Sequence, residues 1–581
     1  MLKEDKLKDQ LSMQIDNSEQ SNQKFLVANS DTPFVLVTFL SSCCMLFLFV
    51  YTSMNRIFYP FDLEWMEGGM LLHGLRIMEG KNLYVEPSSD FIPFIYPPLY
   101  SWLLAIGGWI WELDYPIGRG ISFVSTLLAT GALIMIGRIE KISWPICLSI
   151  GAMFLSTYEN SGTFMDVVRT DSLALALLAW SLLCIRIQYV CFGGLLLCLA
   201  FLAKHNVAVF GFPIVIWLWR THGIKSAVLF SVSSAIPAVL ITIFLQYQSD
   251  GFFLKYILDV PSVHPFVSSR FFWLAPYEMI SGLCIGIFSL FVIIEITKNN
   301  GWNEPKQLFI NISKTNICLV LILFFTVWFH DVFHLWIRDT FLSGFHKNQQ
   351  REIAQCISSI PLLLGFLGML WQGKTILFRH MLWSSCFVVA FLFCCIMRGH
   401  HGGYMNVLMP GFWFLALVIG LFFHQLSQWK HGQKMISFLV LIQLWTGQWE
   451  PHLYIPTTTD IEQGHNHIEK LKELQPPILS PFSPWYAYKA GHPPTFHLIA
   501  LWDIDHSGGV LHPYVQNIRN DISDGRWSAL ILANDQFDFG RKKYYNQKQR
   551  LSRQQMAVKP KIGWREQSKF IFYPSASKES K

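Results

Sequence analysis

Long apolar runs without charge, separated by short polar loops, recur along most of the chain. The first run, Pro33 to Met54, contains no charged residue and is long enough as a helix to cross about 30 Å of hydrocarbon. Similar runs predict about thirteen transmembrane helices, at 33–54, 117–137, 143–158, 172–187, 188–203, 206–219, 226–247, 276–297, 316–336, 356–372, 381–397, 405–425 and 435–448. The pattern therefore predicts an all-α polytopic membrane bundle over residues 32–449.

The segment Pro98–Leu113 is apolar but short, broken by glycines and rich in Trp, so we predict interfacial helices in the loop 55–116. Basic residues then fall on one side of the bundle, in short loops near 138–141, 186, 220–225, 298–306, 374–379 and 430–434. Because such loops are usually cytoplasmic, the N-terminus is predicted inside and the loop 55–116 outside. The assignment leaves Lys255, Arg270, Arg338, Lys347 and Arg351 in external loops.

The two ends of the chain differ from the apolar middle. Residues 1–31 are polar and lack an early apolar core, which predicts a disordered cytoplasmic tail and no cleavable signal. Residues 450–581 have no spanning run and predict a small external α/β domain, with a helix at Ile461–Leu474 and buried strands at Pro477–Leu479 and Ala529–Leu532. Its end, 541–565, is strongly basic, which indicates either a solvated tail or contact with anionic lipid head groups or a phosphorylated glycan.

Composition narrows the class of protein. Charged residues make up 14% of the 581 residues and hydrophobic residues 52%, whereas an average soluble domain is about a quarter charged. This excludes an ordinary cytosolic enzyme, a disordered scaffold and a protein that binds nucleic acid through bulk charge. The twelve cysteines lie in or beside apolar stretches without disulfide or metal-ligand spacing.

The scarce polar residues form clusters on the predicted external side. Asp62 and Glu64 follow the first span, with aromatic residues on both sides. A carboxylate in a dry aromatic pocket can have a pKa suited to base chemistry. The alternative is a pair of solvated residues at the membrane boundary.

A second and a third cluster carry candidate phosphate-binding cations. Asp166, Arg169 and Asp171 lie between two spans, where Arg169 can clamp a phosphate and either acid can complete an acid pair or hold a divalent cation. Lys204 interrupts an apolar sequence, and a lipid-linked phosphate would be a suitable partner for it. The alternatives are a local Arg–Asp pair at a helix end and a Lys that extends to the interface.

The fourth cluster is the glycine-rich stretch 398–406. Arg398, His400 and His401 can meet an anionic oxygen, and the glycines allow close backbone approach. A simple turn is the alternative. Taken together, four polar clusters on one face of a membrane bundle indicate a site for a membrane-embedded phosphate and a transfer that needs a base.

These residues carry a resemblance to a known family. The chain resembles GT-C-type glycosyltransferases, the group that includes protein O-mannosyltransferases and lipid A aminoarabinose transferases, over most of residues 33–425. The similar positions are Asp62-Leu63-Glu64, Tyr84, Tyr96-Pro97-Pro98-Leu99-Tyr100, Gly118-Arg119, Arg169-Thr170-Asp171, Lys204 and Gly402-Gly403-Tyr404-Met405-Asn406. One departure is Leu63, which separates two acids that are often adjacent in the family.

The resemblance implies sugar transfer from a polyprenyl-phosphate donor to a lipid, glycan or protein acceptor, in a bacterial inner membrane. It implies Asp62 as the catalytic base with Glu64 assisting, and Asp166 or Asp171 as the second acidic position. Arg169 and Lys204 would hold the donor phosphate with Arg398 and His400, while Tyr84, Tyr96, His401, Tyr404 and Asn406 would bind substrate. Members differ in metal use, so a divalent cation held by Asp62 and Asp171 remains an alternative.

Two other functions remain open from the sequence. A lipid or polysaccharide transporter or flippase usually places ionisable groups near the membrane midplane, on broken helices and in pseudo-repeats. Here those groups cluster at one interface. A surface-polysaccharide ligase or polymerase could share a lipid-phosphate site, but it usually relies on a large external loop late in the chain.

Overall fold

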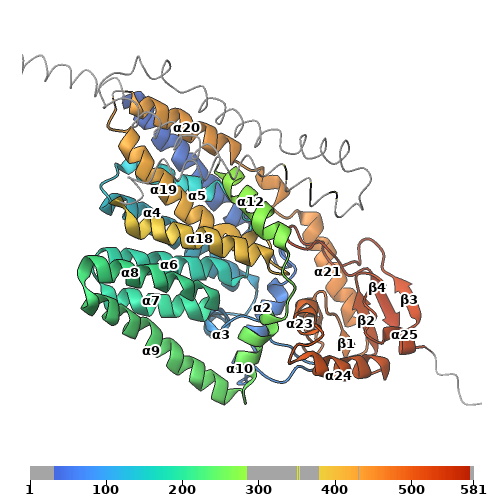
Figure 1. Cartoon of the computed structure of the whole chain (residues 1–581). Coiled ribbons are helices and arrows are strands. Elements are labelled where there is room, and N and C mark those ends of the chain that lie inside the picture. The colour runs from blue at the N-terminus through green and yellow to red at the C-terminus, as the bar shows by residue number, and fades with distance from the viewer. Residues whose placement is uncertain are drawn as a thin grey trace, which may run out of the picture.

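The structure, a computed structural model, describes residues 32–283, 379–429 and 431–575, together with the single residues 350, 353 and 357. It shows a helical bundle followed by a smaller α/β domain (Figure 1). The longer bundle helices are Thr32–Ile57, α2 (Glu67–Met78), α3 (Leu99–Ile110), α4 (Tyr115–Ile139), α5 (Trp144–Leu155), α6 (Thr170–Arg186), α7 (Val190–Ala203), α8 (Gly211–His222), α9 (Ile224–Gln248), α12 (Ala275–Gly282), α18 (Met381–Gly399), α19 (Met409–Leu426) and α20 (Gly432–Thr446). The predicted class, a helical membrane bundle with a small C-terminal α/β part, is confirmed.

Five helices in the described residues are long and apolar enough to cross a membrane: Thr32–Ile57, Tyr115–Ile139, Ile224–Gln248, Met381–Gly399 and Met405–Leu426. Several other predicted spans are shorter helices, such as α5 and α7 with 12 and 14 residues. The predicted number of about thirteen spans is therefore not established. The predicted tail 1–31, the spans 316–336 and 356–372, most of 276–297 and the loop 298–306 lie outside the described residues.

Helix α3 is the segment predicted to lie in the interface. Its 12 residues extend about 18 Å, less than the roughly 30 Å of hydrocarbon. It packs against α2 and α4, while Ile106, Trp109 and Ile110 remain exposed at one edge. A short helix with exposed Trp is typical of a membrane–water interface.

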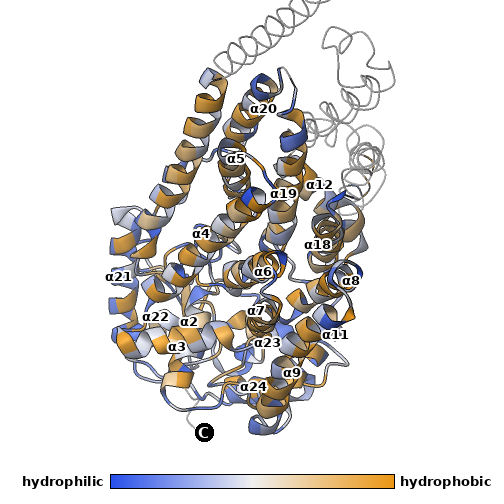
Figure 2. Cartoon of the chain, turned by 90° about the vertical axis from the view of Figure 1, so that its left-hand side faces the viewer, coloured by the Kyte–Doolittle hydropathy of each residue, from blue (hydrophilic) through white to orange (hydrophobic). Residues whose placement is uncertain are grey.

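Small residues bring the central helices close together. Helix α7 packs between α6 and α9, and a methyl group at Gly194 would overlap Ser233 of α9. Such close approach is typical of helix packing in membranes. The outer faces of α9 and α20 remain hydrophobic and exposed (Figure 2), with Leu240, Phe244 and Trp445 each more than half exposed.

The C-terminal domain contains one mixed sheet and five helices. The strands β1 (Ile478–Leu479), β2 (Ala529–Leu532), β3 (Gln547–Arg550) and β4 (Phe570–Tyr573) have the order β1-β2-β4-β3. Strands β1 and β2 are parallel, with Ile478 opposite Ala529, and the other pairs are antiparallel. The helices are α21 (Thr458–Lys472), α22 (Pro484–Lys489), α23 (Leu498–Ile504), α24 (His512–Ser523) and α25 (Arg541–Tyr544). The two strands expected from apolar sequence are β1 and β2.

Two local features of this domain differ from the prediction. The helix expected at Ile461 begins earlier, because Thr457 and Asp460 form a capping box at its N-terminus. The basic segment 541–565, for which a solvated tail was one of the predicted alternatives, is folded, and its strand β3 is exposed along its length. It contains α25 and β3, Arg541 is buried over the Phe572 ring, and Lys548 pairs with Asp535 at 2.5 Å.

The C-terminal domain covers one end of the bundle, beside α2 and α10 (Phe252–Leu254) (Figure 1). Helix α22 packs on α2, and α23 packs on α11 (Val260–Ser262). The first loop and the C-terminal domain therefore lie on the same side of the bundle, as predicted from the charge pattern. Their assignment to the external side remains a prediction.

Candidate functional site

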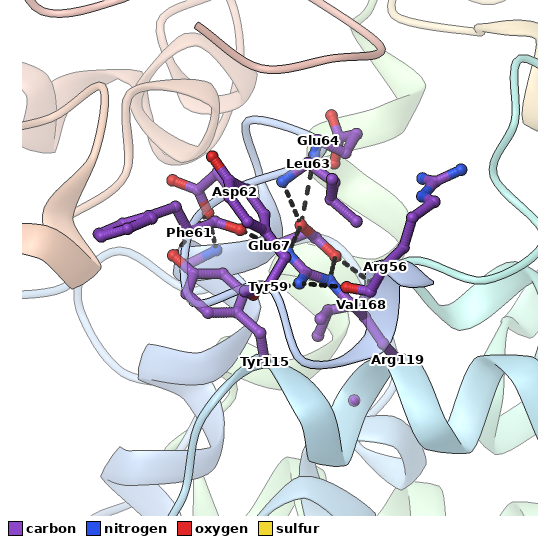
Figure 3. A network of polar contacts seen from close by, with 12 residues as sticks. Arg56, Tyr59, Phe61, Asp62, Leu63, Glu64, Glu67, Tyr115, Arg119 and Val168 are labelled. Carbon is purple, nitrogen blue, oxygen red and sulfur yellow. Dashed lines mark hydrogen bonds and ion pairs between the residues drawn. The ribbon is translucent and has the colours of Figure 1, made fainter. Parts of the chain in front are cut away.

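The loop after the first helix is organised around Glu67, which is fully buried with Arg119 (Figure 3). The Arg119 guanidinium donates two hydrogen bonds to the Glu67 carboxylate, at 2.9 and 2.7 Å. The same carboxylate accepts from the backbone N–H of Leu63 at 2.7 Å and of Val168 at 2.9 Å. Arg119 also donates to the carbonyl oxygens of three loop residues, Arg56, Tyr59 and Phe61. This ion pair holds the loop against α4 and the segment before α6.

Asp62 lies on the side of this loop that faces α22. One of its carboxylate oxygens accepts hydrogen bonds from the Gly68 N–H and the Tyr115 hydroxyl, both at 2.9 Å (Figure 3). Its backbone N–H donates to the Tyr486 hydroxyl at 2.8 Å. Burial and the nearby Glu67 carboxylate raise the pKa of Asp62 well above its ordinary value.

Beside this loop lies a cavity of about 530 Å³. Three parts of the chain line it: the first loop, the adjacent ends of the bundle helices, and the C-terminal domain. The polar and aromatic lining residues are Glu64, Trp65, Tyr96, Phe164, Arg169, Lys204, His205, Asn206, Ser262, His264, His400, His401, Tyr404, Asn406, Asp503 and Trp564. The short helical turn η1 (His205–Phe210) contributes His205 and Asn206 to this lining, and η5 (Met405–Leu408) contributes Asn406.

Glu64 and Arg169 form the first charged pair of the cavity. The Arg169 guanidinium donates to the Glu64 carboxylate at 3.3 Å and to the Tyr96 hydroxyl at 2.9 Å. Its Nε has no hydrogen-bond partner among the described residues and lies 4.0 Å from Asp171. Arg169 thus keeps one buried N–H without a partner among the described residues, and its side chain lines the cavity.

Asp171, Lys204 and Asn406 form the second group. The Lys204 ammonium donates to Asp171 at 2.5 Å, and the Asn406 amide donates to the same oxygen at 3.0 Å. The three side chains come from the start of α6, the end of α7 and η5. Because both the Lys and the Arg are buried at the cavity wall, a negatively charged ligand there meets two cations in a poorly solvated site.

Two carboxylates of the cavity have perturbed acidity. Burial raises the pKa of Glu64 to about 7, although Arg169 acts in the opposite direction. Burial likewise raises the pKa of Asp503 to about 7, again opposed by Arg169. A carboxylate with a pKa near the working pH is suited to accept a proton during reaction.

Most of the predicted site residues meet at this cavity. Glu64, Tyr96, Arg169, Lys204, His400, His401, Tyr404 and Asn406 line it, and Asp171 binds two of them. Residues from the four predicted polar clusters, around positions 62, 169, 204 and 404, thus lie at one cavity.

Four predicted residues lie elsewhere. Asp62 does not line the cavity, as described above. Asp166 pairs with Arg56 at 3.4 Å, and both side chains are fully buried. Arg398 is held by both oxygens of Glu278 at 2.8 Å, so it is committed to an ion pair. Tyr84 donates to the backbone carbonyl of Tyr96 at 2.7 Å and thus positions a lining residue without reaching the cavity.

Three residues that the sequence analysis did not assign prove important to the site. Glu67 organises the loop, and Asp503 and Trp564 line the cavity from the C-terminal domain. Asp503 follows Leu501 and Trp502, and an acid within an apolar helix is a weak sign of a buried carboxylate. Nothing in the sequence around that helix indicates that it packs near the first loop.

A metal site is not found within the residues that the structure describes. No group of three or more His, Cys, Asp and Glu side chains there could hold an ion. The proposed ligand pair is separated as well, because Asp171 binds Lys204 beside the cavity whereas Asp62 points toward α22.

Comparison with solved structures finds four similar chains, among them two structures of ArnT. No protein-family model and no curated protein matches the chain. The chain is similar to ArnT from Cupriavidus metallidurans in the apo state, with 13% identity, a TM-score of 0.44, and coverage of 92% of this chain and 98% of ArnT. ArnT bound to undecaprenyl phosphate is similar at 14% identity, with a TM-score of 0.43 and the same coverage.

Proposed function

We propose that this protein is a membrane glycosyltransferase that moves a sugar from a polyprenyl-phosphate donor to a hydroxyl group of a lipid, glycan or protein acceptor. The observation that carries the proposal is that the Glu64 carboxylate, the Arg169 guanidinium and the Lys204 ammonium line one cavity. A base for the acceptor and cations for a leaving phosphate are the groups that such a transfer requires. The binding of undecaprenyl phosphate by ArnT agrees with the donor class.

In the proposed reaction, Glu64 takes the proton of the acceptor hydroxyl as its oxygen attacks the anomeric carbon. The bond between that carbon and the phosphate oxygen breaks, and its electron pair leaves with the lipid phosphate. Arg169 and Lys204 stabilise the charge that develops on the phosphate. The cavity holds donor and acceptor together, which lowers the entropic cost of their encounter.

In the proposed reaction, Arg169 interacts both with the base Glu64 and with the donor phosphate. In the structure it donates to Glu64, which would weaken the carboxylate as a base. A donor phosphate competes for the same guanidinium, and its arrival would free Glu64 to accept a proton. Donor binding and activation of the base are thereby coupled through one side chain.

The experiment that tests this function uses the purified full-length protein and a panel of polyprenyl-phosphate sugars. Release of polyprenyl phosphate that depends on added acceptor supports a transferase. A transporter would move the lipid across a vesicle membrane and leave the sugar–phosphate bond intact. Movement without release, for every donor in the panel, would contradict the proposal.

Replacing Lys204 by Gln is expected to weaken donor binding. Gln can keep a hydrogen bond to Asp171 but removes the charge, so the KM for the donor should rise about 10- to 100-fold, as for loss of a charge-assisted hydrogen bond. The kcat should change less. The exposed Lys225, in the first turn of α9, provides the control Lys225→Gln. An unchanged donor KM in Lys204→Gln would exclude Lys204 from phosphate binding.

A further inference from the structure

The C-terminal domain holds the backbone on which Glu64 lies. The Ile562 N–H donates to the carbonyl oxygen of Leu63 at 3.0 Å, and Ile562 forms a parallel bridge with Glu64. On the other side of Glu64, the His497 ring bonds to the carbonyl oxygen of Trp65 at 2.9 Å. Both contacts come from residues after 450, so the proposed base is positioned partly by this domain.

Gly563 lies beside the Glu64 carboxylate. Its φ is +68°, a conformation that favours glycine. A methyl group added there would lie 2.9 Å from a carboxylate oxygen of Glu64, which is too close for ordinary contact. Gly563 therefore allows the domain to approach Glu64 without displacing it.

Gly563→Ala is therefore expected to lower kcat several-fold with little change in either KM, because the added methyl group moves Glu64 away from the acceptor. The pH dependence of kcat should also shift, because the added methyl group changes the surroundings of the Glu64 carboxylate. Gly508→Ala is a matched control, since Gly508 also has a positive φ, of +86°, but nothing lies within 4 Å of an added methyl group. Equal losses of kcat in both variants would indicate backbone strain alone.

The domain also contacts the bundle on the opposite wall of the cavity. The His264 ring donates from Nε2 to the backbone carbonyl of Asp503 at 2.8 Å, since a carbonyl oxygen can only accept. His264 further contacts the rings of His400 and His506, with centroids 5.0 and 4.7 Å apart. Helix α23 is thereby fixed against the loops that follow α11 and α18.

The side chain of Asp503 is exposed to the cavity by this arrangement. It lines the cavity and forms no hydrogen bond or ion pair with any described residue. A partly buried carboxylate without a partner is costly. In contrast, the neighbouring Asp505 faces outward and pairs with Arg519 at 3.1 Å.

Tryptophan side chains line the cavity together with Asp503. Trp564 lines the cavity together with Trp65 of the first loop, and their ring centroids are 4.7 Å apart. Trp502, which precedes Asp503, lies 5.0 Å from Trp564. Aromatic rings beside a carboxylate provide an apolar face and a hydrogen-bond acceptor, a combination that suits a polyhydroxylated ring.

We infer that the C-terminal domain completes the substrate site, with the Asp503 carboxylate accepting a hydrogen bond from a hydroxyl or amino group of the bound substrates. This inference rests on the proposed transferase function and deepens it. The group can belong either to the sugar of the donor or to the acceptor, because both chemistries offer such donors. The C-terminal domain then contributes a substrate-binding side chain to the site and does not only cover it.

The test is Asp503→Asn in the full-length protein, with KM measured separately for donor and acceptor. Loss of a charge-assisted hydrogen bond is expected to raise one KM about tenfold or more, with kcat changed less. A rise in the donor KM assigns Asp503 to the sugar, and a rise in the acceptor KM assigns it to the acceptor. Asp505→Asn is the control and should leave both KM values unchanged.

Two outcomes separate this inference from the proposed function. Active wild-type protein with unchanged KM values in Asp503→Asn would overturn the inference and leave the transferase function standing. Wild-type protein that releases no polyprenyl phosphate with any donor and acceptor would overturn both. Thermal unfolding checks that the variant is folded, and Asp503→Ser is a second variant if Asn destabilises the site.

Discussion

Glu64→Gln is expected to abolish most sugar transfer while leaving the protein folded. Glutamine has nearly the same shape and can keep a contact to Arg169, but it cannot accept the acceptor's proton. Loss of a general base lowers the rate by about 10²- to 10⁴-fold. The measurement is kcat for acceptor-dependent release of polyprenyl phosphate, with donor binding measured in parallel to show that the cavity is intact.

Asp62→Asn is the matched comparison for that variant. Asn can accept the hydrogen bonds from Gly68 and Tyr115 through its amide oxygen, and Asp62 does not line the cavity. We expect it to retain far more activity than Glu64→Gln. If Asp62→Asn instead loses more activity than Glu64→Gln, Asp62 is the base, as the family resemblance implies.

The pH dependence of the wild-type protein gives an independent check on Glu64. Burial raises its pKa to about 7, so the carboxylate is protonated and inactive as a base at lower pH. We therefore expect kcat/KM to rise with pH up to about 7, falling about tenfold per pH unit below that value. A rate that stays constant from pH 5 to 7 would contradict a base with this environment.

Arg119→Met is expected to have the largest effect on stability. It would leave the Glu67 carboxylate buried without its cation, and breaking a buried ion pair in this way costs about 3–5 kcal/mol. Transfer should be lost as well, because the Glu67 carboxylate also holds the backbone N–H of Leu63, next to Glu64. The measurement is the midpoint of thermal unfolding in detergent, together with kcat.

An exposed ion pair provides the control for Arg119→Met. Lys472 and Glu469 lie 2.7 Å apart on α21, with about half or more of each side chain exposed. Lys472→Met should cost less than about 1 kcal/mol. If Arg119→Met were as mild as this control, the Arg119–Glu67 pair would not be what organises the loop.

The environment of Glu67 also predicts how the loop responds to acid. Burial raises the pKa of Glu67, but Arg119 and the backbone donors lower it more strongly, so the net shift is downward. The pair therefore stabilises the fold above the pKa of an unfolded Glu, and that stabilisation is lost as the pH falls through the lower pKa of the folded state.

Local sequence patterns predicted the elements but not the orientation of the side chains within the loops. Asp62 and Glu64 are two residues apart in the same polar turn, and the pattern favours neither as a cavity residue. The Asp62 carboxylate accepts a hydrogen bond from Tyr115 of α4, and its backbone N–H donates to Tyr486 of α22, whereas Glu64 accepts from Arg169 at the cavity. These partners come from α4, the C-terminal domain and the start of α6. The sequence around residues 62–64 therefore cannot show which of the two acids lines the cavity.

The same reasoning explains why Arg398 was predicted as a phosphate ligand. Its neighbours are glycines and histidines, which suggest anion binding, but its carboxylate partner Glu278 lies on α12. Asp503 is the opposite case, because its local sequence suggests little and the packing of α23 brings it to the cavity. For both residues, contacts with parts of the chain that are distant in sequence decide where the side chain lies.

The amino-acid sequence by itself determined the class of this protein. Apolar runs too long and uncharged for a soluble core specify membrane-type helices, and the polar remainder after residue 449 specifies a separate small domain. The tertiary structure decided which of the scarce charged groups face one another. Burial makes an unpaired charge costly, so Glu64 pairs with Arg169 and Lys204 with Asp171 across distant parts of the chain, while Asp503 reaches the cavity without a partner among the described residues.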